Sequence, residues 1–438
     1  MTAETYDRGG IATELAAIVT PLVGELPLKL TAWDGSVAGP ESALGVVLHS
    51  PDAVRRLLWH PGELGAAQAY VTGEVDFTGN VADVLDTLMA AGRRGARAPR
   101  TAQARAATEG LRFLARHKLL GRRLPAPASQ ARVRGRLNSK ARDAASIHHH
   151  YDLSNEFYAL ILDDSKAYSS AWFANPPAPD PERADGWGRA TLAEVTGAQF
   201  DKLSLICEKL DLSEGDTLLD VGCGWGSLTM HAALEFGARV TAITIAEEQR
   251  RFVQGRIDAA GVGDRVKVLL CDYRDAPQTI PGAGSFDAVA SIEMGEHVGQ
   301  RNYPTYVDVL NRCVKPGGRV LVQQMSRTGR YPGGGPFIES FIAPDMYMRP
   351  VGETVAFIEK GGLEVIDVQA MREHYVWTVD GWLERFEANA KDLTDLVGDE
   401  VMRVWRLYLI GGRAAFRDGR MGVDQILSRK PTIDGATQ

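Results

Sequence analysis

The sequence has few cysteines and no long apolar run. Its four cysteines, in a chain of 438 residues, are scattered without paired spacing. This pattern argues against a disulfide framework and a zinc site, and it suits a reducing compartment. No apolar stretch approaches the roughly 20 residues that span a bilayer, and the first residues lack the basic-then-apolar order of an export signal. We therefore expect a cytoplasmic protein without a membrane span.

Fibrous and low-complexity classes are excluded as well. Charged residues make up 24% of the chain and apolar residues 45%, and the 46 glycines and 21 prolines are close to ordinary globular usage. The length suffices for two or three domains, each with its own buried core.

Charge is distributed unevenly along the chain. The net charge is -7, yet residues 93–142 contain 15 lysines and arginines and a single acid, Glu109. We expect residues 91–144 to form a basic, partly helical linker. This segment is either solvated or a surface for anionic lipid head groups, to which each nearby cation contributes about 1 kcal/mol. Nucleic acid is not expected as a partner, because Phe113 is the only aromatic residue of the segment that is suited to stacking on bases.

Residues 1–90 have mixed strand and helix patterns. Strands are expected within 26–33 and 44–49, and a helix at 52–59. Glycine and aspartate punctuate 69–79, which predicts a hairpin. We expect a small α+β accessory domain with no visible chemistry of its own.

Beyond residue 216, short runs rich in Val, Ile and Leu alternate with amphipathic stretches. The runs, which predict strands, are 216–221, 239–245, 266–271, 286–292 and 318–325. The stretches that predict helices include 227–236, 246–260 and 303–314. Such alternation predicts an α/β fold with a parallel sheet between layers of helices, within a catalytic domain at 145–438. Ligands bind a sheet of this kind at the carboxyl ends of its strands.

A glycine-rich loop follows the first of these runs. Asp220 precedes Gly222, Gly224 and Gly226, and a helix is expected directly after the last glycine. This spacing departs from the G-x-G-x-x-G of dinucleotide-binding folds, which favours a nucleoside ligand without a pyrophosphate. The next two runs end on polar residues, namely Thr244 with Gln249 beyond it, and Asp272 with Tyr273. Together these features predict the S-adenosylmethionine site of a class I methyltransferase; the alternative is a purely structural turn.

Two further clusters flank this loop in the sequence. HHHYDLSNEFY at 148–158 precedes YSSAWF at 168–173. No metal is expected at the three histidines, because adjacent residues point in different directions and no separate cluster completes a site. SIEMGEHVG at 291–299 follows the fourth strand and places carboxylates where a substrate is expected; the alternative is that they cap a helix.

In this order, HHYDLSNEFY, YSSAWF, LLDVGCGWGSL, EMGEHVG and HYVWTVDGW resemble the cyclopropane-fatty-acyl-phospholipid synthase family, which includes the mycolic acid cyclopropane synthases. The resemblance covers roughly residues 145–420, and residues 1–90 are similar to the accessory domain of the longer bacterial members. It implies a Rossmann-like, S-adenosylmethionine-dependent methyltransferase that acts on the cis double bond of an acyl chain in an intact phospholipid. It also implies a homodimer and a peripheral location at the inner membrane face.

The resemblance implies roles for particular residues. Those implied to contact the donor are Tyr168 and Ser169 at its methionine portion, Gly222 and Gly224 at the strand end, Thr244 and Gln249 at the ribose, and Asp272 with Tyr273 at the adenine. Glu296 and Tyr375 match two family residues around a bound bicarbonate, which acts as the base in the family.

The sequence departs from the family around that bicarbonate. Ser170 stands in place of the usual cysteine, Gln323 where many members have histidine, and Met325 where they have isoleucine. A protein carboxylate, Glu156 or Glu296, is then the expected base instead. These departures favour the branch of the family that makes a 10-methylene acyl chain, the precursor of tuberculostearic acid, over the branch that closes a cyclopropane ring.

Two other classes of function stay open at this point. A small-molecule methyltransferase accounts equally well for the glycine loop, but it does not need the 148–173 segment or the basic segment. A lipid-binding protein without enzymatic activity is the third possibility, and titration with S-adenosylmethionine separates it from the other two.

Overall fold

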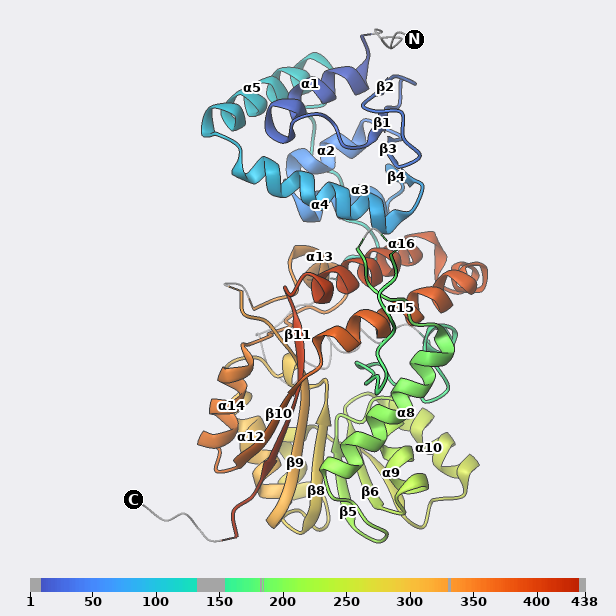
Figure 1. The fold of residues 1–438 in the computed structure, drawn as a ribbon, viewed down its shortest axis with the longest axis vertical. Helices are drawn as coiled ribbons and strands as arrows, with labels where there is room; N and C mark the ends of the chain where they lie inside the picture. The colour runs from blue at the N-terminus through green and yellow to red at the C-terminus, as the bar shows by residue number, and fades with distance from the viewer. Residues whose placement is uncertain (1–8, 132–153, 182, 184, 330–331, 433–438) are drawn as a thin grey trace. The chain divides into compact units, whose positions relative to one another are not determined.

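The computed structural model describes residues 9–131, 154–181, 183, 185–329 and 332–432. The chain forms two compact units, whose helices and strands are labelled in Figure 1. The first comprises residues 1–130 and 398–411, and the second comprises residues 131–397 and 412–438. No helix among the described residues is long and apolar enough to cross a bilayer.

The first unit is an α+β structure with a four-stranded sheet in the order β2-β1-β3-β4. Its strands are β1 (Lys29–Thr31), β2 (Val37–Ala38), β3 (Gly45–Leu48) and β4 (Val75–Thr78). Its helices are α1 (Ile11–Val23), α2 (Asp52–Trp59), α3 (Glu63–Val71), α4 (Val81–Arg97) and α5 (Arg100–Arg116). β1 and β3 pair in parallel, whereas β2 and β4 pair antiparallel at the edges.

The hairpin predicted at 69–79 is wrong. The chain there completes α3, turns at Gly73 with a φ of 76°, and enters β4, which pairs with β3. Burial favours the helix over the hairpin. Ala69, Tyr70 and Val71 are buried, and the ring of Tyr70 stacks on Phe77 with a centroid distance of 4.9 Å. The glycine therefore marks the end of a helix.

The basic segment is not a separate linker over its described part. Helix α5 packs against α1 through a buried apolar cluster that joins Phe113 and Leu114 to Ile11 and Ala12. Residues 91–130 therefore belong to the first compact unit, whose boundary lies well beyond the expected one at residue 90. The basic residues at 132–142 lie outside the described residues.

The second unit is built on a seven-stranded sheet in the order β10-β11-β9-β8-β5-β6-β7. The strands are β5 (Thr217–Val221), β6 (Arg239–Thr244), β7 (Val266–Leu270), β8 (Phe286–Ile292), β9 (Val314–Ser326), β10 (Glu364–Ala370) and β11 (Gly422–Arg429). The first five run in parallel, as expected from their apolar runs, and β11 joins β9 antiparallel with β10 beyond it. This parallel-rich α/β sheet confirms the predicted fold class.

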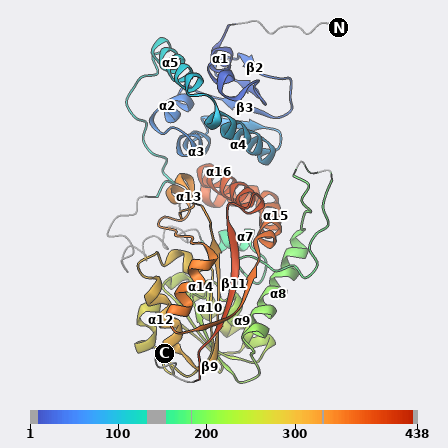
Figure 2. The same ribbon diagram turned by 60° about the vertical axis from the view of Figure 1, so that its left-hand side comes forward.

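Helices cover both faces of this sheet (Figure 2). The helices with residues in the second unit are α7 (Asn155–Ile161), α8 (Leu192–Lys209), α9 (Ser227–Glu235), α10 (Glu247–Ala260), α11 (Ala276–Thr279), α12 (Tyr303–Cys313), α13 (Pro336–Phe341), α14 (Val351–Lys360), α15 (Arg372–Ala388) and α16 (Ala390–Arg417), with single 3-10 turns at Tyr273–Asp275 and Gly295–His297. Residues 398–411 of α16 belong to the first unit. One buried cluster joins α8, α9 and α10 to the sheet, and another joins α11, α12 and α14. Because β5 has β6 on one side and β8 on the other, the strand order reverses at β5, which is where such sheets bind ligands.

Candidate active site

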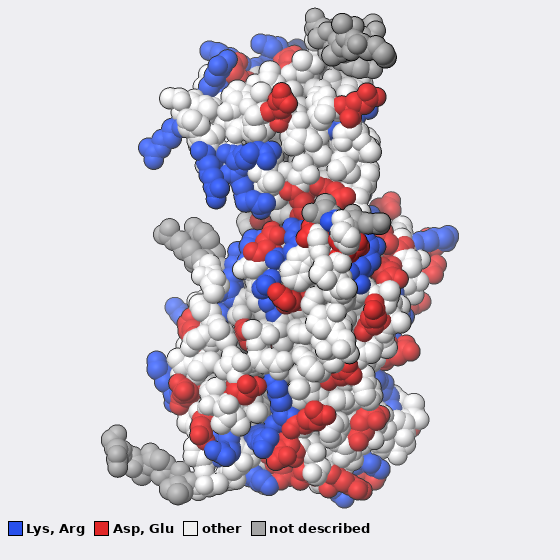
Figure 3. All heavy atoms as spheres, in the orientation of Figure 1, with Lys and Arg blue, Asp and Glu red and all other residues white. Residues whose placement is uncertain are grey.

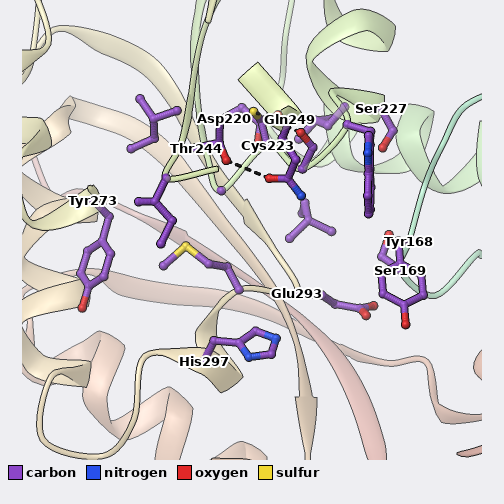
Figure 4. A pocket seen from close by; sticks show the side chains of 18 of the residues that line it. Tyr168, Ser169, Asp220, Cys223, Ser227, Thr244, Gln249, Tyr273, Glu293 and His297 are labelled. Atoms are coloured by element: carbon purple, nitrogen blue, oxygen red, sulfur yellow. Dashed lines mark hydrogen bonds between the residues drawn. The ribbon is translucent and has the colours of Figure 1, made fainter. Parts of the chain in front are cut away.

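A pocket opens at the carboxyl ends of β5, β6, β7 and β8. Its volume is about 1160 Å³, including its open mouth, and Figure 4 shows side chains from several elements converging on it. The residues expected at the donor that line this pocket are Tyr168, Ser169, Asp220, Gly222, Gly224, Thr244, Gln249, Asp272 and Tyr273. Segments more than 100 residues apart in the sequence therefore meet where the glycine loop predicted a ligand.

The three glycines of the loop all have left-handed backbones, with φ of 83° at Gly222, 53° at Gly224 and 77° at Gly226. A Cβ at Gly222 would lie 2.9 Å from the sulfur of Met294, whereas one at Gly224 would meet no atom within 4 Å and would project into pocket space. Gly226 is not among the lining residues; a Cβ there would lie 3.0 Å from Val253 of α10. Gly226 therefore allows close helix packing, and the other two leave room for a ligand against the main chain.

The polar side chains of the loop region are already ordered by hydrogen bonds. Asp220 is buried and accepts a hydrogen bond from the hydroxyl of Thr229 at 2.7 Å, and burial raises its pKa to about 6. The hydroxyl of Thr244 donates to Oε1 of Gln249 at 2.8 Å (Figure 4). At the third strand, Asp272 pairs with Arg274 at 2.6 Å. The open pocket and these fixed polar groups fit a nucleoside ligand.

A half-buried carboxylate, Glu293, forms the other end of the pocket wall. Its Oε1 accepts hydrogen bonds from the Ser170 amide at 2.8 Å and from Nε2 of Gln323 at 2.9 Å, and its Oε2 accepts one from the Tyr375 hydroxyl at 2.7 Å. In Figure 4 its side chain points toward Tyr168 and Ser169. Ser170, Gln323 and Tyr375 were all expected at the catalytic centre. They meet at the carboxylate of Glu293, for which no role was expected.

The backbone of Glu293 is strained. Its φ of 48° is uncommon for a residue with a side chain, and such strain costs about 1–3 kcal/mol and concentrates at functional sites. The residue comes directly after β8, beside the point where the strand order reverses. That position in SIEMGEHVG is the signal by which the sequence could have identified it; the resemblance instead drew attention to Glu296.

Glu296 occupies a different place from the expected one. It is buried but does not line the pocket, and its Oε2 has no hydrogen-bond partner. Burial and the charge of Glu293 raise its pKa to about 8, while its own amide and that of Met325 oppose the rise. The Tyr375 hydroxyl binds Glu293 rather than Glu296. Met325 therefore acts on Glu296 through its main chain, and its side chain does not line the pocket.

The two carboxylates, Glu293 and Glu296, differ in how strongly their surroundings favour the protonated form. Burial also raises the pKa of Glu293, but three hydrogen bonds and the ammonium of Lys202 favour its ionised form. Glu296 has only backbone donors and a distant guanidinium, so it is the member of the pair that holds the proton near neutral pH. Glu293 is thus the member of the pair whose surroundings favour the ionised form.

Glu156, the other expected base, is not at the site. It lies in the first turn of α7, where its side chain is exposed, and it does not line the pocket. A carboxylate there is favoured by the helix dipole, which is a local reason for its presence. The histidines at 148–150 lie outside the described residues, and the described part of the chain holds no cluster of three or more potential metal ligands.

Sequence reasoning also missed two other lining residues. Lys202 of α8 is fully buried, and its ammonium donates to the Ser169 hydroxyl at 2.8 Å. His297 lines the pocket as well, and burial lowers its pKa to about 4, so its ring is neutral. Neither stands in a pattern that indicates its burial from sequence alone.

Comparisons with known proteins agree with this geometry. Residues 138–426 match the family model described as mycolic acid cyclopropane synthetase. The chain is 35% identical to the probable fatty acid methyltransferase Rv3720 of Mycobacterium tuberculosis, over 93% of this chain and 92% of that protein. It is 33% identical to the tuberculostearic acid methyltransferase UfaA1 of the same organism, over 95% and 92%.

Solved structures give the same result. The cyclopropane synthase MmaA2 of Mycobacterium tuberculosis superposes with a TM-score of 0.57 at 27% identity, over 66% of this chain and 98% of that one. The mycolic acid cyclopropane synthase CmaA1, complexed with SAH and CTAB, superposes with a TM-score of 0.56 at 29% identity over the same shares.

The sheet order, the glycine loop and the pocket define a class I S-adenosylmethionine-dependent methyltransferase. Within that class, the chain belongs to the mycolic acid cyclopropane synthetase family. The resemblance read from its motifs is thereby confirmed, as is S-adenosylmethionine as cofactor, and a lipid-binding protein without enzymatic activity is excluded.

Proposed function

We propose that this enzyme methylates the cis double bond of an unsaturated acyl chain in a membrane phospholipid, with Glu293 as the base and a 10-methylene chain as the product. The observation that carries the proposal is the half-buried carboxylate of Glu293, which lines the donor pocket and accepts three hydrogen bonds. The names of two relatives, a probable fatty acid methyltransferase and a tuberculostearic acid methyltransferase, support an acyl substrate.

The chemistry requires a dry site and a fixed base. S-adenosylmethionine, when bound, supplies an electrophilic methyl group. Its transfer forms a carbon–carbon bond to one alkene carbon and leaves a positive charge on the other. That charge must be kept from water until a proton is removed, and buried aromatic side chains beside the site, such as Tyr375 stacked on Phe416, serve this purpose.

Glu293 accepts the proton in either outcome. Loss of a proton directly from the new methyl group closes a cyclopropane ring. If a hydride first shifts from the methylated carbon to its neighbour, loss of the same kind of proton leaves an exocyclic methylene group. The placement of the base relative to the two cations decides between them, and Ser170, Gln323 and Tyr375 fix that placement here.

Bicarbonate is not required in this proposal. The resemblance implied an anion beside Tyr375 and the positions of Ser170 and Gln323. In the structure these three groups donate to the carboxylate of Glu293, so a protein side chain supplies the negative charge. Full activity in bicarbonate-free buffer is expected.

The test is product analysis with purified enzyme. Vesicles of oleoyl phospholipid and S-adenosylmethionine are incubated with the enzyme, and the fatty esters are identified by mass spectrometry. A 10-methylene ester supports the proposal, and a cyclopropane ester as the sole product contradicts its last step. Methylation of polar soluble compounds alone would favour the small-molecule methyltransferase.

Substitution of the base is the second arm of this test. Glu293→Gln keeps the size of the side chain but removes its basicity, so kcat is expected to fall by roughly 10²–10⁴. Binding of S-adenosylhomocysteine, measured by calorimetry, is expected to change little. A Glu293→Gln enzyme with normal turnover would show that another group removes the proton.

Location at the membrane is part of the proposal. Five exposed arginines lie near one another in the sequence of α4 and α5, and we refer to them as the basic patch; they are Arg93, Arg94, Arg97, Arg100 and Arg105. Figure 3 shows lysine and arginine side chains gathered on part of the surface of the first unit. Leu111 of α5, 58% exposed, and Leu120, 57% exposed, stand beside this basic sequence. Cations with nearby exposed apolar side chains suit peripheral binding to anionic lipid. The homodimer stays a prediction.

A further inference from the structure

Lys202 is a buried cation to which the proposed reaction assigns no role. It lies in α8, is 1% exposed, and lines the donor pocket. Its ammonium donates to the Ser169 hydroxyl at 2.8 Å. Burial of an ammonium group is costly unless negative charges face it, so its surroundings require an explanation.

Three carboxylates act on this ammonium from three different elements. They are the buried Asp163 after α7, the buried Asp220 at the end of β5, and the half-buried Glu293 after β8. On α9 the nearby His231 is neutral, because burial and Lys202 lower its pKa to about 4.

Other cations reach only one of these carboxylates. Lys166 and Arg256 also act on Asp163. Removal of the Lys202 ammonium would therefore mainly leave Asp220 and Glu293 without compensation.

The same lysine also braces the main chain beside Glu293. Two side chains of α8 hold Ser169: Lys202 binds its hydroxyl, and Nε2 of Gln199 donates to its carbonyl oxygen at 2.8 Å. The next residue, Ser170, donates its amide to Glu293 at 2.8 Å. Helix α8 thus determines where one of the three donors to Glu293 lies.

We propose that Lys202 is a positioning residue that keeps Glu293 ionised until proton transfer, by the charge of its ammonium and by its hold on the segment that carries the Ser170 amide. This inference rests on the proposed function, because it takes Glu293 to be the base. It assigns α8 a role in the chemistry in addition to its packing against the sheet.

The charge states are consistent with this role. Burial lowers the pKa of Lys202 to about 8, and the three carboxylates oppose that change. The ammonium is therefore mainly protonated at neutral pH and loses its proton in mildly alkaline solution. Groups that face Glu293 itself are Ser170, Gln323, Tyr375, Lys202 and the protonated Glu296.

The experiment compares pH profiles of kcat for Lys202→Met, Lys202→Arg and Gln199→Met. Without the ammonium, Glu293 must be ionised at higher pH, so the acidic limb of Lys202→Met is expected to move up by about one pH unit. Its kcat at pH 7 is expected to fall about tenfold or more. Gln199→Met loosens the same segment without a change of charge, so it is expected to lower kcat and leave the limb in place.

The decline of kcat at alkaline pH gives an independent test of the role of Lys202. In the wild type, kcat is expected to decline near pH 8 as Lys202 loses its proton. Lys202→Arg stays charged, so its decline is expected at higher pH. This comparison decides the matter even if Lys202→Met does not fold, which calorimetry with S-adenosylhomocysteine would reveal.

Several outcomes would overturn the inference. One is a folded Lys202→Met whose kcat profile has an unshifted acidic limb. A second is a shift of the same size in Gln199→Met. A third is an alkaline limb at the same pH in Lys202→Arg as in the wild type. Failure of the proposed function is distinct from these, because it requires normal turnover in Glu293→Gln. An inactive Glu293→Gln with an unshifted Lys202→Met would leave Glu293 as the base and remove only the role of Lys202.

Discussion

At the scale of single residues, the surroundings of Glu293 favour its ionised form, and those of Glu296 favour its protonated form. Three donors and an ammonium stabilise the charge of one carboxylate, and burial beside that charge keeps the other protonated. Two identical side chains, three residues apart, are thus given different protonation states by packing. This contrast leads to a separate prediction for each residue. For Glu293 it is the fall in kcat expected of Glu293→Gln.

Glu296→Gln is expected to have the opposite effect. Glutamine resembles the protonated acid in shape, so kcat at pH 7 is expected to stay within a few-fold of the wild type. Because the pKa of Glu296 is raised to about 8, the folded state binds more protons than the unfolded state between about pH 4.5 and 8. Wild-type stability therefore declines as pH rises through this range, and the decline is smaller in the variant.

Melting temperatures measured from pH 5 to pH 9 check this expectation. Glu156→Gln provides the control, since it changes an exposed carboxyl group that does not line the pocket. Identical pH dependence of stability in wild type and Glu296→Gln would show that Glu296 is ionised in the folded protein. Loss of turnover in Glu296→Gln, with Glu293→Gln active, would exchange the roles of the two residues.

At the scale of elements, the turn from β5 into α9 shapes the donor site. Gly222 combines a φ of 83° with the sulfur of Met294 at 2.9 Å from the position of a Cβ. The strand end, the loop and the residue after β8 therefore approach each other closely only with glycine at this position. A side chain would push the loop away from Met294, one residue from Glu293.

Gly222→Ala is expected to lower stability by about 1–3 kcal/mol, because alanine is strained in a left-handed conformation. Affinity for S-adenosylhomocysteine is expected to fall as well, by calorimetric titration. Gly255→Ala is the matched control: it lies exposed in α10 with no atom within 4 Å of a Cβ, and alanine there is expected to stabilise by about 0.5–1 kcal/mol. Unchanged affinity in Gly222→Ala would place the donor elsewhere.

At the scale of the whole molecule, the catalytic pocket and the basic patch belong to different compact units. The proposed function therefore assigns chemistry and binding to anionic lipid to separate cores. The proposal that the patch binds anionic lipid predicts dependence on both lipid charge and salt, since surface electrostatic attraction is screened within about 10 Å at 0.1 M ionic strength.

Reversal of three charges in the patch tests this. Arg93→Glu combined with Arg94→Glu and Arg97→Glu is expected to reduce sedimentation with anionic phospholipid vesicles at least tenfold at low salt, because each cation contributes about 1 kcal/mol. The control reverses Arg239, Arg265 and Lys267 of the second unit, for the same change in net charge. Equal losses in both variants would indicate a general charge effect without a docking surface.

The local pattern of the sequence was sufficient for the parallel strands, the glycine loop and the family. Apolar runs and their spacing are properties of neighbouring residues, and they predicted β5 to β8 and helices α9, α10 and α12 to within about a residue. The strand predicted at 318–325 begins earlier, at Val314, and the short helix α11 was not predicted. The strands β10 and β11, the packing of α5 on α1 and the helix in place of a hairpin depended on contacts that no local pattern records.

Only the tertiary structure decided which carboxylate serves the site. Glu293 takes its donors from residues 123, 82 and 30 positions away, and its buried ammonium from α8. The protonation state of a carboxyl group depends on how much water reaches it and which dipoles face it, and both are set by packing between distant segments. The sequence thus determined that a methyl donor binds beside acidic residues, and the fold determined which of those residues carries the charge.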